Sequence, residues 1–395
     1  MQIKPAAGLT ACKGGHFMYR ILKIGMDVHT TNFTLCALES KFGEEDVVLA
    51  NITVGPDHKN VLDFIRRIQE KMDPKGKDKI DVECGYEAGC LGYSLHRLLT
   101  ACKLKCTILA PTTMHSEKGR RIKTDSRDAK LIAQCLSNGG YHAVHIPTAE
   151  DNAVKEYIRM RDDHKLALKK IKQQILAFCL RHNYRYPGGT KYWTQAHLKW
   201  LRDLKPGGVY QEILEEYLLT YSNLVDKLER LDKRIEELAA DKEYAESVHK
   251  LICFLGIKTQ SALSVITETG DFKRFGNAQQ YASYLGLVPG EDSSGEDQNR
   301  LKITKAGNRH LRMLLVEAAQ SYGRGQIGHK SKELKKRQEG NLPEVIAYAD
   351  KANERLRRRY YRMVLSQNKR SNVAKVAVAR ELACFIWGMM TGNVA

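Results

Sequence analysis

Four carboxylate residues stand where a metal-dependent reaction could be carried out. Asp27 lies at the end of a short apolar run, and Glu87 follows a second such run. Asp125 and Asp128 open an expected helix, and their spacing of three residues places both side chains on one helical face. Hard oxygen ligands of this kind suit Mg²⁺, which takes substrate phosphates as further ligands. The set therefore predicts phosphodiester chemistry, in which metal ions stabilise the attacking and leaving oxygens.

Each acid also has an ordinary structural interpretation. Asp125 could be a helix N-cap, and Asp128 a favourable charge in the first helical turn. Glu87 has a rival in Glu83, which falls inside the expected strand and is interpreted as facing solvent. His29 is interpreted as a local structural or phosphate-facing residue rather than a ligand. The combination of four acids on suitable elements of a basic chain favours the functional interpretation.

The elements that must position these acids follow the order of a ribonuclease-H-like domain. Hydrophobic periodicity predicts three strands, followed by alternating helices and strands. In such a sheet the first and fourth strands are adjacent, so Asp27 and Glu87 would converge on the last helix. The pattern alone leaves several α/β folds open. The expected elements are strands 21–28, 31–38 and 47–54, helix 61–72, strand 80–84, helix 91–102, strand 104–109 and helix 126–136.

The chain changes character after residue 150. Apolar residues recur every three or four positions over 152–182 and 210–240, with Lys and Glu between them. This pattern predicts an antiparallel helical hairpin or coiled-coil arm, interrupted by Pro-Gly-Gly turns at 187–189 and 206–208. A coiled coil commonly implies a dimer, whereas an intrachain bundle does not, and the sequence leaves both open. The remainder of the chain is predicted to be mainly helical.

The charge balance points to an acidic partner. The 395 residues include 64 Lys and Arg against 46 Asp and Glu, a formal charge of +18, and nucleic acid is the expected partner. An evenly solvated basic protein is the alternative. A hydrophobic content of 43% excludes a disordered chain, and the absence of a long apolar run excludes a membrane span. Scattered cysteines without a CxxC pair predict a reducing compartment and no zinc site.

A second group of candidate residues lies between 284 and 312. Ser293 and Ser294 stand in a glycine-flanked turn, and the following segment carries Lys305, Arg309 and Arg312. A serine beside several cations could act as a nucleophile next to a phosphate-binding site. Ser-Gly is also common turn chemistry, and the chemistry alone favours an ordinary loop.

Further cations could contact nucleic acid. The segment 254–258 and the apolar helix after it are similar to a helix-hairpin-helix element, which grips the DNA backbone through amides at a helix N-terminus. Tyr360 and Tyr361 are interpreted either as base-stacking residues or as core residues. The cations expected to neutralise phosphates are Lys123, Lys258, Lys305, Arg309, Arg312, Arg355, Arg357, Arg358, Arg359 and Arg362.

In their order and spacing, four stretches resemble the transposases of the insertion-sequence 110 family, the DEDD transposases described as bridge-RNA-guided recombinases. A closing stretch over 377–382 extends the resemblance to nearly the whole chain after Met18. The stretches are 24–29, 86–89, 123–129, and 285–289 continuing through 294–295 to 307–309.

The resemblance implies an α/β plus α architecture: a RuvC-like domain, a helical arm and a mainly helical C-terminal domain. It also implies an insertion-sequence transposase located in the prokaryotic cytoplasm with the nucleoid. Translation could begin at Met1 or Met18. The expected parts are a disordered extension over 1–17, the DEDD catalytic domain over 18–149, the coiled-coil arm over 150–250, the transposase domain with the serine over 251–323, and a basic segment with C-terminal helices over 324–395.

For the chemistry, the resemblance implies that the four acids bind Mg²⁺ and that Ser294 forms a covalent 5′-phosphoserine link, with Ser293 as the close rival. It further implies composite sites in a homodimer or homotetramer, and a non-coding RNA that pairs with donor and target DNA. Glu296 and Asp297 depart from the family pattern and put the local loop conformation in doubt. The segment 324–342 corresponds to none of these stretches and is interpreted as an insertion.

Two other functions remain open from the sequence. A Holliday-junction-resolving nuclease would use the same acids with water as the nucleophile and would not need Ser294. A non-enzymatic nucleic-acid-binding protein on a decayed nuclease fold would need none of the acids. No GxxxxGK[ST] loop is present, which agrees with strand exchange through a covalent intermediate without ATP.

Overall fold

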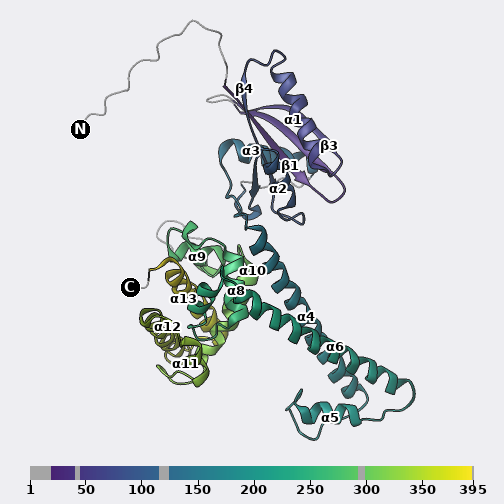
Figure 1. The fold of residues 1–395 in the computed structure, drawn as a ribbon, viewed down its shortest axis with the longest axis vertical. Coiled ribbons are helices and arrows are strands. Elements are labelled where there is room, and N and C mark those ends of the chain that lie inside the picture. The colour runs from purple at the N-terminus through teal and green to yellow at the C-terminus, as the bar shows by residue number, and fades with distance from the viewer. Residues whose placement is uncertain (1–18, 41–44, 115–123, 292–298, 394–395) are drawn as a thin grey trace, which may run out of the picture. The chain divides into compact units, whose positions relative to one another are not determined.

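The chain forms two compact units, Met1–Ile146 and Pro147–Ala395. The structure, a computed structural model, describes residues 19–40, 45–114, 124–291 and 299–393 (Figure 1). Within these residues no helix is both long enough and apolar enough to cross a bilayer. Each unit has its own core, so the two are described separately.

The first unit contains a five-stranded mixed sheet in the order β3-β2-β1-β4-β5. The first three strands are antiparallel neighbours, whereas β1 pairs in parallel with β4, and β4 with β5. This is the ribonuclease-H-like arrangement, and the predicted adjacency of the first and fourth strands is confirmed. The strands are β1 (Tyr19–Val28), β2 (Phe33–Ser40), β3 (Val47–Val54), β4 (Lys79–Glu87) and β5 (Lys105–Leu109).

Helices cover both faces of this sheet. On one face, α1 (His58–Met72) and α2 (Ser94–Ala101) pack with Leu22, Ile24 and Met26 of β1 in one apolar core. The opposite face of β1 presents Lys23, Gly25 and Asp27, because successive strand residues point to opposite sides. Helix α3 (Asp125–Asn138) covers that second face.

The packing of α3 on the sheet depends on two glycines at paired positions. A Cβ atom at Gly25 would lie 2.1 Å from the carbonyl oxygen of Ala129 and 2.3 Å from the amide nitrogen of Ala133. A Cβ atom at Gly85, the parallel partner of Gly25, would lie 3.1 Å from a methyl carbon of Leu136. The backbone of α3 therefore lies directly on β1, which no larger residue at position 25 would permit.

The second unit begins with a helical arm. The long helices α4 (Ala149–Arg181) and α6 (Gly208–Ala239) pack against each other, and α5 (Gln195–Asp203) joins them at the far end of the arm (Figure 1). Residues from all three helices share a small core there, including Phe178, Leu201 and Leu214. The predicted antiparallel hairpin is confirmed as an intrachain structure.

The base of the arm is continuous with the rest of the second unit. A single core includes Ile158 and Ile235 of the arm and reaches Met389 near the C-terminus, so the segments expected separately as 150–250, 251–323 and 324–395 pack together. The further elements are α7 (Ala245–Leu251), α8 (Thr259–Thr269), α9 (Ala278–Tyr284), β6 (Pro289–Glu291), β7 (Arg300–Ile303), α10 (Arg309–Ala319), α11 (Lys332–Gln338), α12 (Pro343–Tyr361) and α13 (Ser371–Thr391).

The segment interpreted as an insertion is docked on this core. Arg337 of α11 donates a hydrogen bond to the carbonyl oxygen of Ile257 at 2.7 Å, and buried Gln338 donates to that of Cys253 at 3.2 Å. Both acceptors lie in the connection between α7 and α8, the part predicted to resemble a helix-hairpin-helix element. The segment thus supports that turn.

We predict that Gly25→Ala loosens α3 by about 1–3 kcal/mol, because the added methyl group would overlap the helix backbone. Hydrogen exchange read by mass spectrometry should show faster exchange over Asp125–Asn138. Gly89→Ala is the matched control, since a Cβ atom there would meet only the Glu87 carbonyl oxygen at 3.8 Å. Unchanged protection of α3 in Gly25→Ala would contradict the packing described here.

Candidate metal centre and its supporting contacts

The end of β1 and the start of α3 bring three possible metal ligands together. One ligand atom from each of Asp27, His29 and Asp125 lies within 4.8 Å of the other two. The Nε2 atom of His29 is 3.3 Å from Oδ2 of Asp27. The Asp27 side chain is 18% exposed, whereas Asp125 and His29 face solvent. One ligand of the group, Asp27, is therefore held in the sheet, and the other two are accessible to solvent.

The electrostatics of Asp27 suit a cation site. Burial raises the pKa of its carboxyl group, the neighbouring His29 lowers it, and the charges of Asp125 and Asp128 raise it further, so that the net pKa is above the usual value. A carboxylate that is desolvated among other carboxylates lacks a stabilising positive charge. A bound divalent cation would supply that charge and favour the ionised form.

The other two predicted ligands lie on the expected elements. Asp128 is half-buried, three residues along α3 from Asp125, and its charge acts on Asp27. Glu87 is the last residue of β4, rather than following the strand, and is exposed. The pairing of Gly25 with Gly85 places Asp27 and Glu87 at equivalent positions on the same sheet face. Glu87 and Asp128 nevertheless lie outside the close group of ligand atoms.

Glu83 corrects one expectation, because its side chain does not face solvent. It is 7% exposed, and its Oε2 atom lies 2.6 Å from Nζ of Lys23 and 3.3 Å from Nζ of Lys105. Burial opposes its ionisation, but the ion pair with Lys23 outweighs this effect and holds the pKa of Glu83 below its usual value. Glu83 therefore has its own counter-ions and is not a rival ligand to Glu87.

His29 is a further candidate ligand beside Asp27, although the sequence favoured a structural or phosphate-facing role for it. Its amide donates to the carbonyl oxygen of Asn32 at 2.9 Å in the turn after β1, and its Nε2 atom lies 3.3 Å from Oδ2 of Asp27. The spacing of two residues in Asp27-Val28-His29 was the available signal, because alternate residues of a strand share a face. Oxygen ligands fit Mg²⁺, and an imidazole nitrogen beside them also fits Mn²⁺.

The candidate nucleophile lies outside the described residues. Ser293 and Ser294 belong to the segment 292–298, which connects β6 and β7 in the chain, and Lys123 is likewise not described. The base of the hairpin is described: the amide of Thr304 donates to the carbonyl oxygen of Val288 at 2.9 Å. The hairpin leads directly into the turn that begins α10.

That turn is tightly packed and capped by Asn308. A Cβ atom at Gly307, where φ is +72°, would lie 1.9 Å from the carbonyl oxygen of Tyr284, so the position requires glycine. The side-chain oxygen of Asn308 accepts a hydrogen bond from the Leu311 amide at 3.0 Å and so caps α10. The motif Gly307-Asn308-Arg309 thus fixes the point where the hairpin meets the helix.

Buried Glu268 of α8 connects this turn to the arm. Its carboxylate accepts two hydrogen bonds from Arg159 of α4, at 2.6 and 2.9 Å, and a third from the side chain of Asn308 at 2.8 Å. Burial opposes ionisation of Glu268, but the hydrogen bonds from Arg159 and Asn308 outweigh it and hold its pKa below the usual value. One carboxylate therefore joins α4, α8 and α10.

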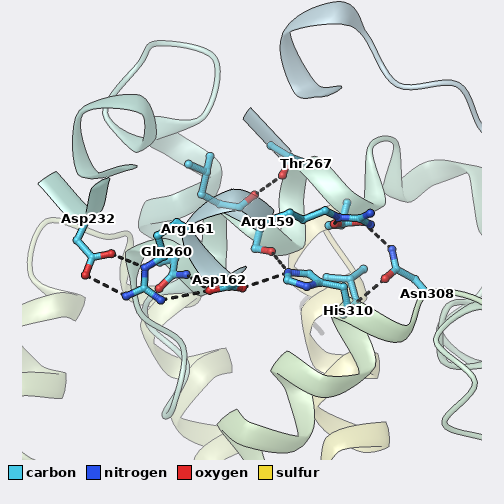
Figure 2. Close-up of polar contacts among 12 residues, drawn as sticks. Arg159, Arg161, Asp162, Asp232, Gln260, Thr267, Asn308 and His310 are labelled. Carbon is cyan, nitrogen blue, oxygen red and sulfur yellow. Dashed lines mark hydrogen bonds and ion pairs between the residues drawn. The ribbon is translucent and has the colours of Figure 1, made fainter. Parts of the chain in front are cut away.

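A second polar group extends along the same helices (Figure 2). Arg161 pairs with Asp232 of α6 through two contacts, at 2.6 and 2.9 Å, and reaches Asp162 at 3.2 Å. The Nε2 atom of His310 lies 3.1 Å from the Ser264 hydroxyl and 3.8 Å from Asp162. Both contacts use the same ring nitrogen and Ser264 is buried, so these residues do not form a hydrolytic triad.

The predicted phosphate-binding cations divide by environment. Lys305, Arg309 and Arg362 are exposed. Lys258 is also exposed and pairs with Glu333 at 2.9 Å. The exposed side chains of Arg355 and Arg358 pair with Glu381 and Glu354.

Three other arginines of the predicted phosphate-binding set make internal contacts in the structure. Arg312 donates to the carbonyl oxygens of Leu285 and Ala306, at 2.8 and 3.1 Å, and so supports the turn. Arg359 lies 3.2 Å from Glu381 and is 28% exposed. Arg357 is 5% exposed and so is no part of a solvent-facing cluster.

The two tyrosines beside them also have internal partners. Tyr360 is buried and shares a hydrogen bond of 2.9 Å with the Ser371 hydroxyl. Tyr361 donates to the carbonyl oxygen of Gly325 at 2.7 Å. The structure thus confirms the core interpretation for Tyr360, and Tyr361 supports the turn after α10.

Comparison with known proteins shows that the chain is similar to transposases along most of its length. A family of transposases whose name combines DEDD and IS110 matches residues 24–183, and the transposase family IS116/IS110/IS902 matches residues 249–333. The y4qE protein of Sinorhizobium fredii is 36% identical, over 97% of this chain and 92% of its own length. The transposase of insertion sequence element IS1533 from Leptospira borgpetersenii is 29% identical, over 91% of this chain and 100% of its own.

A solved structure of Thermus thermophilus RuvC covers 31% of this chain and 99% of its own chain, with 12% identity and a TM-score of 0.23. The sequence matches define the protein as a transposase, an enzyme that cleaves and rejoins DNA strands. Within that class, the chain belongs to the IS110 family, as its motifs indicated.

We predict that Asp27→Asn abolishes binding of Mn²⁺, the probe ion, because it removes the anchored carboxylate of the group. The affinity of the wild type for Mn²⁺ should fall on acidification, because protons compete with the cation for the carboxylate. Since the pKa of Asp27 is raised, this fall should begin at a higher pH than it would for an ordinary aspartate. Isothermal titration calorimetry at several pH values measures both effects. Asp63→Asn, which removes a surface acid paired with Arg66, is the control. Full Mn²⁺ binding by Asp27→Asn would contradict the assignment.

We predict that Glu268→Gln destabilises the second unit by about 1.5–3 kcal/mol near neutral pH, because charge-assisted hydrogen bonds to Arg159 and Asn308 weaken. A carboxyl group whose pKa is lower in the folded than in the unfolded protein stabilises the fold at any pH above its unfolded-state pKa. This stabilisation is lost as the pH falls through its folded-state pKa. The difference in unfolding free energy between Glu268→Gln and wild type should therefore shrink as the pH falls below 4.5, the ordinary pKa of a glutamate.

Urea denaturation followed by tryptophan fluorescence reports on this unit, because Trp193, Trp200 and Trp387 all lie within it. Glu246→Gln, which changes a surface acid paired with Lys250, is the matched control and should remain close to wild type. A pH-independent difference for Glu268→Gln would show that shape, rather than charge, explains the loss.

Proposed function

We propose that this transposase cuts and rejoins DNA through a Mg²⁺-dependent site at its four DEDD carboxylates and a serine nucleophile, Ser294, under the direction of a non-coding RNA. The observation that carries the metal part is the approach of Asp27, His29 and Asp125 to within 4.8 Å of one another. The raised pKa of Asp27 adds support, because burial and the charges of Asp125 and Asp128 disfavour its ionised form when no cation is bound.

The first unit would orient the scissile phosphate. Asp27 and Asp125 would hold the cation, and Asp128 and Glu87 would complete the ligand set from the same face of the sheet. When bound, the ion would supply positive charge for the phosphate oxygens. His29 lies beside Asp27 at 3.3 Å and would keep that carboxylate in position.

The serine step conserves the energy of the phosphodiester bond. The Ser294 hydroxyl oxygen would attack phosphorus, the bond from phosphorus to the 3′ oxygen would break, and the 3′ hydroxyl would leave with the proton. A 3′ hydroxyl from another strand would then attack the 5′-phosphoserine and release the serine. Arg309 and Lys305 are exposed beside the hairpin and would contact phosphates.

Assembly and guidance belong to the same proposal. The charge of +18 suits binding of both RNA and DNA. The catalytic acids and Ser294 lie in different compact units, which is compatible with sites composed of residues from two copies in a homodimer or homotetramer. The expected setting is the prokaryotic cytoplasm, at the nucleoid.

The decisive measurement is the trapping of covalent protein–DNA adducts with Mg²⁺, element-end DNA and the flanking non-coding RNA. We predict that Ser294→Ala and Asp27→Asn both lose the adduct, whereas Ser293→Ala and the control Asp63→Asn retain it. Without the RNA, wild-type protein should form little adduct, because the RNA selects the DNA.

Two outcomes would contradict parts of this proposal. DNA cleavage without any adduct would exclude the serine mechanism and leave a nuclease that uses water. Loss of the adduct in Ser293→Ala, with retention in Ser294→Ala, would reassign the nucleophile.

A further inference from the structure

A pocket of about 480 Å³ opens on the second unit after α10. It lies where the 3₁₀ turn η3 (Gln320–Gly323) continues into residues 324–326 beside α12. Two guanidinium groups and a hydroxyl group face a volume that would accommodate one phosphate group. The lining residues are Glu317, Gln320, Ser321, Arg324, Gly325 and Arg357.

Arg357 is unusual because it is buried without a counter-ion. It is 5% exposed, and its Nη1 atom donates to the carbonyl oxygen of Gln326. Its Nε atom is buried and lacks a hydrogen-bond partner, and no carboxylate in the described part of the chain pairs with the side chain. A desolvated charge without an anionic partner is costly.

Neighbouring arginines of the same helix show the contrast. Arg355 and Arg359 both pair with Glu381, and Arg358 pairs with Glu354. Glu381 of α13 and Glu354 of α12 therefore supply carboxylates to the arginines around Arg357, whereas Arg357 lines the pocket. The arrangement favours an anion supplied from outside the chain.

The turn that forms the pocket wall is held by α12. Tyr361 donates to the carbonyl oxygen of Gly325 at 2.7 Å, and the Gln326 carbonyl oxygen accepts from the His329 amide at 3.2 Å as well as from Arg357. Gly325 has φ of +79°, and a Cβ atom there would lie 3.2 Å from Nη1 of Arg357. The pocket is therefore a preorganised part of the fold.

We propose that this pocket binds one phosphodiester group of the nucleic-acid backbone, held by Arg324 and Arg357 with Ser321 as a further donor. Guanidinium groups match phosphate oxygens in geometry and charge. The exposed Glu317 carboxylate also lines the pocket and repels anions. This repulsion is stronger for a free phosphate with two negative charges than for a phosphodiester with one, so it favours the phosphodiester. The site rests on the proposed function, since it assumes a nucleic-acid substrate.

The test measures duplex DNA binding by fluorescence anisotropy at several salt concentrations, without Mg²⁺. Arg324→Gln should lower the affinity and reduce the slope of log affinity against log salt by about 0.9, the value for one phosphate contact. The ratio of the DNA affinity of the wild type to that of the variant should then decrease roughly 3.5-fold between about 50 and 200 mM salt. Lys351→Gln removes an exposed charge of α12 outside the pocket and is the matched control.

A second variant separates binding from folding. Arg357→Met should weaken duplex binding and raise the thermal unfolding midpoint of the free protein, because it removes a buried charge without a counter-ion. A lower midpoint with unchanged DNA affinity would show that Arg357 only supports the turn, and would overturn the proposal.

Two further outcomes would also overturn it. One is an Arg324→Gln variant with wild-type affinity and salt slope. The other is saturable binding of inorganic phosphate that Arg324→Gln abolishes while DNA affinity is unchanged, because the ligand would then be a free phosphate. The binding assay needs neither Mg²⁺ nor Ser294, so its failure and a failure of the adduct experiment are distinguishable.

Discussion

The close contact between α3 and β1 at Gly25 is the constraint on which the acidic site depends. The carbonyl oxygen of Ala129 would lie 2.1 Å from any Cβ atom at position 25, so the helix backbone rests on the strand itself. Asp125 is only four residues before Ala129, and Asp27 only two after Gly25. This approach therefore brings two carboxylates from distant parts of the sequence to one point, where burial and, to a smaller extent, the charges of Asp125 and Asp128 raise the pKa of Asp27.

The second unit uses charge differently, because its buried acid is fully compensated. Glu268 accepts hydrogen bonds from both Arg159 and Asn308, and its pKa is lowered. The same Asn308 caps α10, directly after the hairpin strand β7. Glu268 and Asn308 thus link the arm to the turn that begins α10.

Much of the first unit could be predicted from the sequence, because strand alternation and helix periodicity are local signals. The order of the elements and the adjacency of β1 and β4 were predicted correctly, and so was the position of Asp27 and Asp125 on facing elements. Ion pairing is not local: nothing near Glu83 in the sequence indicates Lys105, and nothing near Glu268 indicates Arg159. The environments of these acids therefore required the structure.

Arg357 shows a case in which a local signal existed. The buried positions of α12 include Ala349, Ala352, Asn353, Leu356 and Tyr360, a stripe with helical spacing that also contains position 357. A run of arginines suggests a solvated basic face, but the helix turns one of them toward the interior. Burial of this charge carries a desolvation penalty, which the proposed phosphate contact would offset. The acidic group around Asp27 and the buried guanidinium of Arg357 carry charges of opposite sign, which suits the cation and the nucleic acid proposed as their partners.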